Sequence, residues 1–234
     1  MDEYPGLALY DGGVDDAYEN YALRDPGHFA KTEKFSEEFE KSAKFGFDFF
    51  SRAGRPHIWP LFPGVPDEAG NVLKRLGAER GEDFYAMSAD IAGTEPALKH
   101  DDVKTGESPL EETEARAWAE SAWRGFGSDE SAPESFIAFA LGMAERREFS
   151  LFHLSGRATG MLFAAGETCG VYYISTLPEF RGRGLGGAVV DMLKARAAER
   201  GFGKVTLLAT PSGRALYLKH GFADLGTVKI YRSG

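Results

Sequence analysis

The spacing of apolar residues predicts a regular series of helices and strands in the second half of the chain. Segments with helical spacing and helix-end signals are 109–126, 132–148, 186–200 and 212–221. Segments with short β-type apolar runs between turn residues are 149–154, 158–166, 169–177, 204–210 and 222–232. This order predicts an α/β (α+β) domain with a central mixed, mostly antiparallel sheet flanked by helices.

Individual positions within these segments are predicted in more detail. Phe136, Phe139, Ala140 and Met143 fall on one face of the second helix, as do Val190, Leu193 and Ala197 of the third. Gly201 stands where a C-terminal cap is expected, and Ser212 is the expected N-cap of the last helix.

Residues 91–109 break this pattern, because they mix charges, prolines and glycines with no sustained apolar period. We interpret them as a linker. They divide the chain into two predicted domains, 1–100 and 101–234.

Composition and charge narrow the classes of partner. Of 234 residues, 43% are hydrophobic and 27% charged, as in ordinary globular proteins. The net charge of −9 argues against nucleic acid, since a phosphate backbone needs a basic surface. The single cysteine, Cys169, excludes a disulfide framework or thiolate metal site and fits a reducing cytoplasm.

The sequence also carries no sign of membrane insertion or secretion. No apolar run is long enough to span a bilayer, and the acidic start lacks the apolar core of a secretion signal. We therefore expect a cytoplasmic protein that binds no nucleic acid, membrane or metal. The oligomeric state, including a homodimer, is left open.

A glycine-rich loop before the helix at 186–200 is the strongest chemical signal. The stretch RGRGLGG (residues 181–187) contains G-x-G-x-x-G, but an Arg-containing segment separates it from the preceding strand and no acidic residue ends the next strand. No Gly-Lys-Ser/Thr follows, which excludes a Walker A loop. Successive glycines at a helix N-terminus can direct several N–H groups at one anion, such as a pyrophosphate.

The loop and its surroundings resemble the GNAT superfamily of acyl-CoA N-acyltransferases. The family signature R/Q-x-x-G-x-G/A occurs as Arg181-x-x-Gly184-x-Gly186, directly before a helix. A strand that ends one residue before a proline precedes it, and the run LYLKHGF (residues 216–222) follows in the expected order. The resemblance covers residues 109–232.

The resemblance implies an N-acetyltransferase that uses acetyl-CoA and acetylates a primary amine of a small molecule or peptide by direct attack. It implies that the backbone of Ser175, Thr176 and Leu177 pairs with the pantetheine arm, and that an N–H near Leu177 faces the thioester oxygen. Tyr217 is the implied general acid. The implied pyrophosphate loop consists of Arg181, Gly182, Arg183, Gly184, Leu185, Gly186 and Gly187.

The general base is where this sequence departs from the family, in which many members carry a glutamate on the strand before the loop. Residues 170–177 offer only Tyr172, Tyr173, Ser175 and Thr176 as polar side chains. A non-catalytic acyl-CoA sensor or partner-binding protein therefore remains an alternative. A dinucleotide-binding oxidoreductase is a second alternative, which binding of NAD(P)H without coenzyme A would favour.

The first half contains a weak echo of the end of the second. Residues 71–91 and 214–232 each combine a short helix, a glycine and a final strand, with Gly77 aligned to Gly221. A helix with Phe35, Phe39 and Phe49 buried is expected within 31–54, and a strand within 56–62. We predict a degenerate acyltransferase-like copy that has lost the glycine loop and the tyrosine. The three tryptophans are either core residues or lining of an acceptor pocket: Trp59, Trp118 and Trp123.

Overall fold

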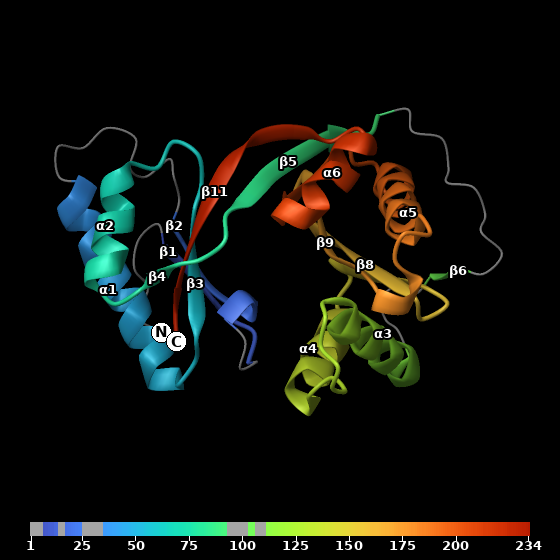
Figure 1. Ribbon diagram of the computed structural model, residues 1–234, viewed down its shortest axis with the longest axis horizontal. Coiled ribbons are helices and arrows are strands. Elements are labelled where there is room, and N and C mark those ends of the chain that lie inside the picture. Colours follow the sequence, from blue (N-terminus) through green and yellow to red (C-terminus); the bar gives the residue numbers. More distant parts are fainter. Residues whose placement is uncertain (1–6, 14–16, 25–34, 93–102, 106–110) are drawn as a thin grey trace. The chain divides into compact units, whose positions relative to one another are not determined.

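Two strands of the computed structural model each begin in one compact unit of the chain and end in the other. The structure describes residues 7–13, 17–24, 35–92, 103–105 and 111–234 (Figure 1). The units are Met1–Tyr85 with Gly226–Gly234, and Ala86–Leu225. The shared strands are β5 (Phe84–Asp90) and β11 (Ala223–Ser233).

These units do not coincide with the domains predicted from the sequence, because the end of the chain is a strand of the first unit. The predicted linker lies largely outside the described residues. Within it, Val103–Thr105 form β6, a strand that the sequence pattern did not indicate.

The first unit contains strands in the order β1-β2-β3-β11, with β4 also paired to β11. The β2–β3 pair is parallel, whereas β1–β2, β3–β11 and β4–β11 are antiparallel. The elements are β1 (Leu7–Asp11), a 3-10 turn (Ala17–Glu19), β2 (Asn20–Arg24), α1 (Phe35–Ala53), β3 (His57–Leu61), α2 (Asp67–Arg75) and β4 (Glu79–Arg80).

Helix α1 packs through positions that recur at helical spacing, namely Phe39, Ala43, Gly46 and Phe50. The expectation for Phe49 was wrong: its side chain is 39% exposed, because Phe50 rather than Phe49 continues the buried stripe. Gly46 has no side chain because a Cβ there would lie 2.6 Å from the Trp59 ring. Trp59 is 1% exposed and therefore belongs to the core.

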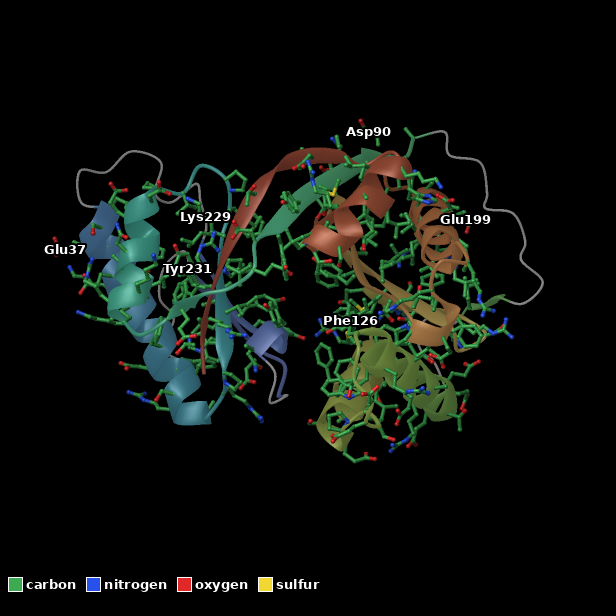
Figure 2. All side chains as sticks on the ribbon, viewed as in Figure 1. Glu37, Asp90, Phe126, Glu199, Lys229 and Tyr231 are labelled. Atoms are coloured by element: carbon green, nitrogen blue, oxygen red, sulfur yellow. The ribbon has the colours of Figure 1, made fainter. Side chains whose placement is uncertain are left out.

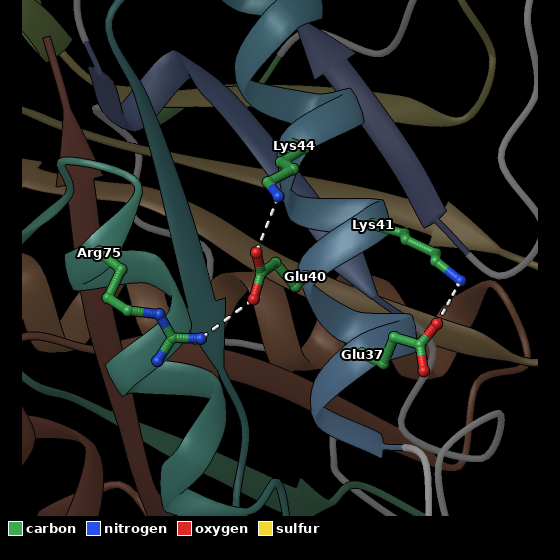
Figure 3. A network of polar contacts seen from close by, with 5 residues as sticks. All are labelled: Glu37, Glu40, Lys41, Lys44 and Arg75. Carbon is green, nitrogen blue, oxygen red and sulfur yellow. Dashed lines mark hydrogen bonds and ion pairs between the residues drawn. The ribbon is translucent and has the colours of Figure 1, made fainter.

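An exposed network of ion pairs along α1 connects this helix to α2 through Arg75 and Glu40. Figure 3 shows Glu40 between Lys44, at 2.8 Å, and Arg75, at 3.0 Å, with Glu37 and Lys41 paired one turn away. The hydrogen bond from Lys44, followed by that from Arg75, lowers the pKa of the Glu40 carboxyl. Because these groups lie in solvent, the buried apolar contacts stabilise the unit far more than the charges do.

The second unit is a sheet of order β5-β10-β9-β8-β7-β6. Only the β9–β10 pair is parallel among the registers from β6 to β10, which confirms the predicted mixed, mostly antiparallel sheet. The elements are α3 (Glu112–Gly125), α4 (Glu134–Ala144), β7 (Phe149–Leu154), β8 (Ala158–Ala165), β9 (Thr168–Thr176), a 3-10 turn (Pro178–Phe180), α5 (Leu185–Glu199), β10 (Lys204–Ala209) and α6 (Pro211–Lys219).

Helices cover both faces of this sheet. In Figure 1, β8 and β9 lie between the α3–α4 pair and α5. At Gly160 of β8, a Cβ would meet Val189 and Leu193 of α5 at 2.6 and 2.8 Å. From the other face, the Trp118 indole N–H of α3 donates to the Gly160 carbonyl at 3.2 Å. The small residue thus allows both helices to approach the centre of the sheet.

The residues of the predicted helix faces are buried except Phe139, which is half-buried, and one cap differs. Gly201 ends α5 with a φ of 86°, and the Phe202 N–H donates to the Ala197 carbonyl across it. The N-cap of α6 is Thr210 rather than Ser212, since the Thr210 hydroxyl accepts from the Gly213 N–H at 3.2 Å. Proline 211 then occupies the first helical position, where its missing N–H costs nothing.

The two segments that resemble each other in sequence, 71–91 and 214–232, also share the geometry of one helix C-terminus. After α2, Gly77 has a φ of 98° and the Ala78 N–H donates to the Leu73 carbonyl at 3.0 Å. After α6, Gly221 has a φ of 82° and the Phe222 N–H donates to the Tyr217 carbonyl at 3.0 Å. Since many unrelated helices end in this way, a second copy of the fold stays a prediction.

The buried histidine of the first unit predicts an acid-sensitive stability. His57 is 3% exposed and stacks on Phe50 with ring centroids 4.4 Å apart, and burial lowers its pKa to about 4. The unfolded chain takes up this proton near pH 6.5, whereas the folded protein resists it. Acidification from pH 6.5 to about 4 should therefore reduce the free energy of unfolding, by up to about 3 kcal/mol.

Melting temperatures of wild type and His57→Phe between pH 7.5 and 4.5 test this. We expect the wild-type melting temperature to fall more steeply, because Phe keeps the ring contact and removes the titrating group. Parallel curves would exclude His57 as the source of the acid sensitivity.

Candidate active site

Strand β9 loses its partner on one side partway along its length. Strand β10 pairs with it only at Val205–Cys169 and Thr206–Gly170. On its other side, β8 accompanies β9 from Ala165–Thr168 to Ala158–Thr176. Within the described part of the chain, the β9 edge from residue 171 to residue 176 therefore has no strand partner. Its outward N–H and C=O groups can bind an extended ligand in the way that a further strand would.

A β-bulge lies at the centre of this open edge. Two residues of β9, Tyr173 and Ile174, oppose the single residue Gly160 of β8, and Tyr173 has a φ of 53°. The Thr159 hydroxyl donates to the Tyr173 carbonyl at 3.0 Å and lies 2.7 Å from the Ser175 hydroxyl. These hydrogen bonds hold the strained backbone in place.

The Tyr173 ring is enclosed by aromatic residues of α3, α4 and the turn after α3. Its ring centroid lies 5.3 Å from that of Trp118 and 6.1 Å from those of Phe126 and Phe136. Phe126 directly follows α3, and its side chain is 59% exposed (Figure 2). Trp118 is fully buried, so it is a core residue that supports the bulge, and Trp123 packs on Phe136 at 5.2 Å.

The glycine loop has the geometry of an anion site. Gly182 and Gly184 have φ values of 74° and 80°, which residues other than glycine rarely adopt. Helix α5 begins at Leu185 with Gly184 as an N-cap that offers no side-chain hydrogen bond. The first-turn N–H groups of residues 185–187 have no acceptor within the helix and add to the positive end of its dipole.

The last two glycines of the loop differ in their surroundings. A Cβ at Gly187 would lie 2.5 Å from His220 Nε2, so this glycine allows the end of α6 to pack on α5. His220 is held there by Asp191, whose carboxylate lies 2.8 Å from its Nδ1. A Cβ at Gly186 would meet Leu216 and Thr176 only at 3.5 Å, which is ordinary contact. A Cβ at Gly186 is therefore tolerated by the packing.

The two arginines of the loop both contact neighbouring backbone groups. Arg181 Nε donates to the Thr176 carbonyl at 3.1 Å, and its Nη2 donates to the Gly125 carbonyl at 2.9 Å. Arg183 donates to the Glu179 carbonyl at 3.2 Å and lies over the Phe180 ring. Both side chains thus contact protein groups beside the loop, and the Arg181 N–H donates to the Pro178 carbonyl at 3.2 Å. The N–H groups at the start of α5 remain the candidate donors for an anion.

Leu177 does not offer its own N–H to a ligand, because this group donates to the Arg157 carbonyl of the β8 side at 2.9 Å. Alternation along an antiparallel pair then directs the Thr176 N–H to the open edge. Of the N–H groups near Leu177, that of Thr176 is therefore the candidate for the expected oxyanion donor. The Thr176 carbonyl, on the same side, is already bound by Arg181.

Tyr217 projects from α6 and is 8% exposed. Burial raises the pKa of its phenol to about 12, which keeps the hydroxyl protonated at neutral pH. Its ring lies 5.7 Å from that of Phe222, and a Cβ at Gly213 would come within 3.2 Å of it. No described residue forms a hydrogen bond with this hydroxyl.

Other candidate chemistry is limited. Burial raises the pKa of the Cys169 thiol to about 11, so it is a protonated core residue. Burial also raises the pKa of Tyr172. Across the described ranges, no three His, Cys, Asp or Glu side chains are grouped to hold a metal ion. None of the helices in the described part is both long and apolar enough to cross a membrane.

Comparison with known proteins identifies the region that carries this geometry. The model of the acetyltransferase (GNAT) family matches residues 101–222, which make up more than half of the chain. The match contains the open edge of β9, the glycine loop and Tyr217. A search of curated proteins found no match.

Solved structures with the same fold cover nearly the whole chain at low sequence identity. A GCN5-related N-acetyltransferase from Sphaerobacter thermophilus is 13% identical with a TM-score of 0.65, over 97% of this chain and 75% of that one. One from Kribbella flavida is 16% identical with a TM-score of 0.62, over 97% and 86%. A tandem GNAT protein from the clavulanic acid biosynthesis pathway is 13% identical with a TM-score of 0.57, over 98% and 83%.

The close approach of α3 to β9 predicts a specific pair of substitutions. A Cβ at Gly125 would lie 2.2 Å from Ser175 Oγ and 2.7 Å from its Cβ. Gly125→Ala should therefore destabilise the protein by roughly 1–3 kcal/mol through overpacking. Adding Ser175→Gly removes both clashing atoms and should recover much of that loss.

Melting temperatures of the single and double variants test the pair, with Gly142→Ala as the control, because a Cβ at Gly142 of α4 meets no atom within 4 Å. If Ser175→Gly added its own destabilisation without any recovery, the proposed packing of α3 on β9 would be wrong.

Proposed function

Because this chain belongs to the acetyltransferase (GNAT) family, whose members transfer acyl groups, we propose that it moves an acetyl group from acetyl-CoA to a primary amine. The acceptor is a small molecule or a peptide, and the amine attacks the thioester directly. The open edge of β9, which leads straight into the glycine loop, is the single observation that carries this proposal.

The residues of the second unit fit the three chemical parts of an acyl-coenzyme A. Pyrophosphate needs several N–H donors at a positive helix end, and the loop with the first turn of α5 supplies them: residues 182–187. The pantetheine arm carries amides that pair with a strand edge, and β9 offers that edge. When bound, the thioester supplies the carbonyl carbon that an amine attacks.

Backbone and side-chain donors of this chain then act on the reacting atoms. We propose that the Thr176 N–H donates to the thioester oxygen, where negative charge develops during attack. We propose that Tyr217 gives its proton to the departing thiolate. A phenol with a pKa of about 12 holds that proton throughout the neutral range and is therefore available as an acid.

The polar side chains on β9 support direct attack without a strong base in this strand. The raised pKa values of Tyr172 and Cys169 make both groups poor bases and poor nucleophiles at neutral pH. The acceptor amine therefore arrives neutral or loses its proton to water. On this mechanism, the rate should rise with pH as the free amine fraction of the acceptor increases.

We further propose that residues 1–100 include a degenerate copy of the fold, with the catalytic domain at 101–234. The shared helix ends at Gly77 and Gly221 support this, as does the likeness to a protein described as a tandem GNAT protein. The first copy has no equivalent of the loop at 181–187 in its sequence. Coenzyme A would then bind once per chain.

Titration calorimetry with acetyl-CoA, followed by turnover assays on polyamines, amino acids, aminoglycosides and peptides, tests the function as a whole. Binding with turnover supports the enzyme. Binding with no turnover on any acceptor class would favour a non-catalytic acyl-CoA sensor, and binding of NAD(P)H without acetyl-CoA would overturn the proposal.

The loop itself is best tested at Gly186, because a Cβ there meets its neighbours only at ordinary contact distance, while a valine would crowd the space beside the N–H groups of the first turn. We expect Gly186→Val to weaken acetyl-CoA binding roughly a hundredfold, since charge-assisted hydrogen bonds to the anion are lost. Gly142→Val makes the same change in the exposed middle of α4 and should leave affinity unaltered. Equal affinities of the Gly186 variant and wild type would show that the loop does not hold the cofactor.

Tyr217→Phe separates a catalytic hydroxyl from a packing ring. Turnover should fall roughly a hundredfold while the acetyl-CoA dissociation constant stays nearly constant, because the hydroxyl acts only in the transition state. Tyr231→Phe, which removes a hydroxyl from another buried tyrosine, in the first unit, should leave turnover near wild type. Full activity of the Tyr217 variant would remove this residue from the mechanism.

A further inference from the structure

The guanidinium of Arg181 joins two backbone segments that lie far apart in the sequence. It binds the carbonyl of Thr176, at the end of β9, and that of Gly125, the last residue of α3. Both are direct hydrogen bonds, at 3.1 and 2.9 Å. The arginine that opens the family signature is thus attached to the protein rather than free to hold a phosphate.

This contact completes a series of ties between α3 and the sheet. The Trp118 indole binds the Gly160 carbonyl, and the Ser121 hydroxyl binds the Gly156 carbonyl at 3.2 Å. Beyond them, the helix end can approach β9 only because residue 125 has no side chain. The carbonyl of Gly125, at the end of α3, has no N–H donor within the helix, and Arg181 supplies one.

The charge of Arg181 is not neutralised by a carboxylate. Its two contacts are neutral carbonyl oxygens, and within the described residues it forms no ion pair. Neighbouring Glu179 pairs instead with Arg124 at 3.7 Å. A positive charge therefore stands at the carbonyl of the same residue whose N–H faces the open edge.

We infer that Arg181 is a positioning residue: by holding the Thr176 carbonyl it fixes the Thr176–Leu177 peptide and locks α3 against β9. The adjoining Ser175–Thr176 peptide, whose N–H is the proposed oxyanion donor, is thereby restrained before the substrates bind. The inference rests on the proposed function and deepens it. It assigns to Arg181 an effect on the rate of transfer rather than on the affinity for coenzyme A. A displacement of a donor by a fraction of an ångström is sufficient to reduce the rate substantially.

Removal of the side chain with chemical rescue tests the inference. In Arg181→Ala, we expect the acetyl-CoA dissociation constant to change by less than about threefold, while kcat falls at least about tenfold. Guanidinium at millimolar concentration should restore part of kcat, because it can occupy the space between the two carbonyls. Methylammonium lacks the planar fork and should restore less.

Arg200→Ala is the matched control, since Arg200 also bridges separate segments, through Ser150 Oγ at 2.9 Å and the Arg147 carbonyl at 3.2 Å. It lies at the opposite end of α5 from the loop. This variant should lose stability without losing kcat, and guanidinium should not affect its rate. If Arg181→Ala behaved in the same way, Arg181 would be merely structural.

Hydrogen exchange provides a readout that needs no substrate. The Phe126 N–H donates to the Ala122 carbonyl at 3.1 Å in the last turn of α3. This turn should exchange faster in Arg181→Ala and at the wild-type rate in Arg200→Ala. If the Arg181 variant does not fold, Arg181→Gln keeps one donor group and should show the same pattern with smaller changes.

The outcomes separate this inference from the proposed function. A parallel loss of acetyl-CoA binding, as expected for Gly186→Val, would make Arg181 a phosphate ligand and overturn the inference. Unchanged kcat would overturn it as well, and so would a reduced kcat that guanidinium does not restore. Absence of acetyl-CoA binding by the wild-type protein would instead refute the proposed function.

Discussion

The loss of strand pairing along one side of β9 is the constraint on which the candidate site depends. A strand in the middle of a sheet normally satisfies its backbone groups on both sides, and an unpaired edge in the interior of a fold is costly. Here β10 separates from β9 after Gly170, while the bulge at Tyr173 turns the strand. An extended ligand with its own amides restores the missing pairs, so the geometry that would otherwise be a defect provides binding energy.

The energy that maintains this open edge comes from elements on both sides of the sheet. Aromatic rings of α3 and α4 surround Tyr173, and the Thr159 hydroxyl binds the carbonyl of the same residue. On the opposite face, α5 packs through Val189 and Leu193 onto Gly160. A strained φ persists only where surrounding contacts over-determine it, and these contacts meet that condition. The same core contacts that stabilise the second unit therefore also hold the open edge of β9 in its shape.

Much of the second unit could be predicted from the sequence because local signals agree with each other. Apolar spacing, the glycine after α5 and the proline at the start of α6 act locally to set where the helices begin and end. Turn residues separate the strands between 149 and 176 in the same local way. Ser212 and Thr210 are both good cap residues, and Thr210 is the N-cap because the helix already includes Pro211. Phe49 and Phe50 are equally apolar, so a shift of one residue in the predicted buried face of α1 exchanges which of them is buried.

The finer features of the site depend on contacts distant in sequence and could not be found in this way. The hydrogen-bonding direction of Leu177 is set by its register with β8, and the partners of Arg181 include a residue 56 positions away. Gly125 carries no local signal, since its importance comes only from Ser175 across the packed faces. Motif and periodicity identify the loop, but the orientation of each group along the open edge is a tertiary property.

The membership of β11 in the first unit has a consequence for how the protein is made. Residues 229–233 pair with β3, and residues 231–232 with β4, yet they are translated after the entire second unit. While the ribosome is still synthesising the second unit, β3 exposes a long hydrogen-bonding edge that can pair with other chains. The second unit can close its core first, and the first unit is therefore completed only after the second, although most of it precedes the second in the sequence.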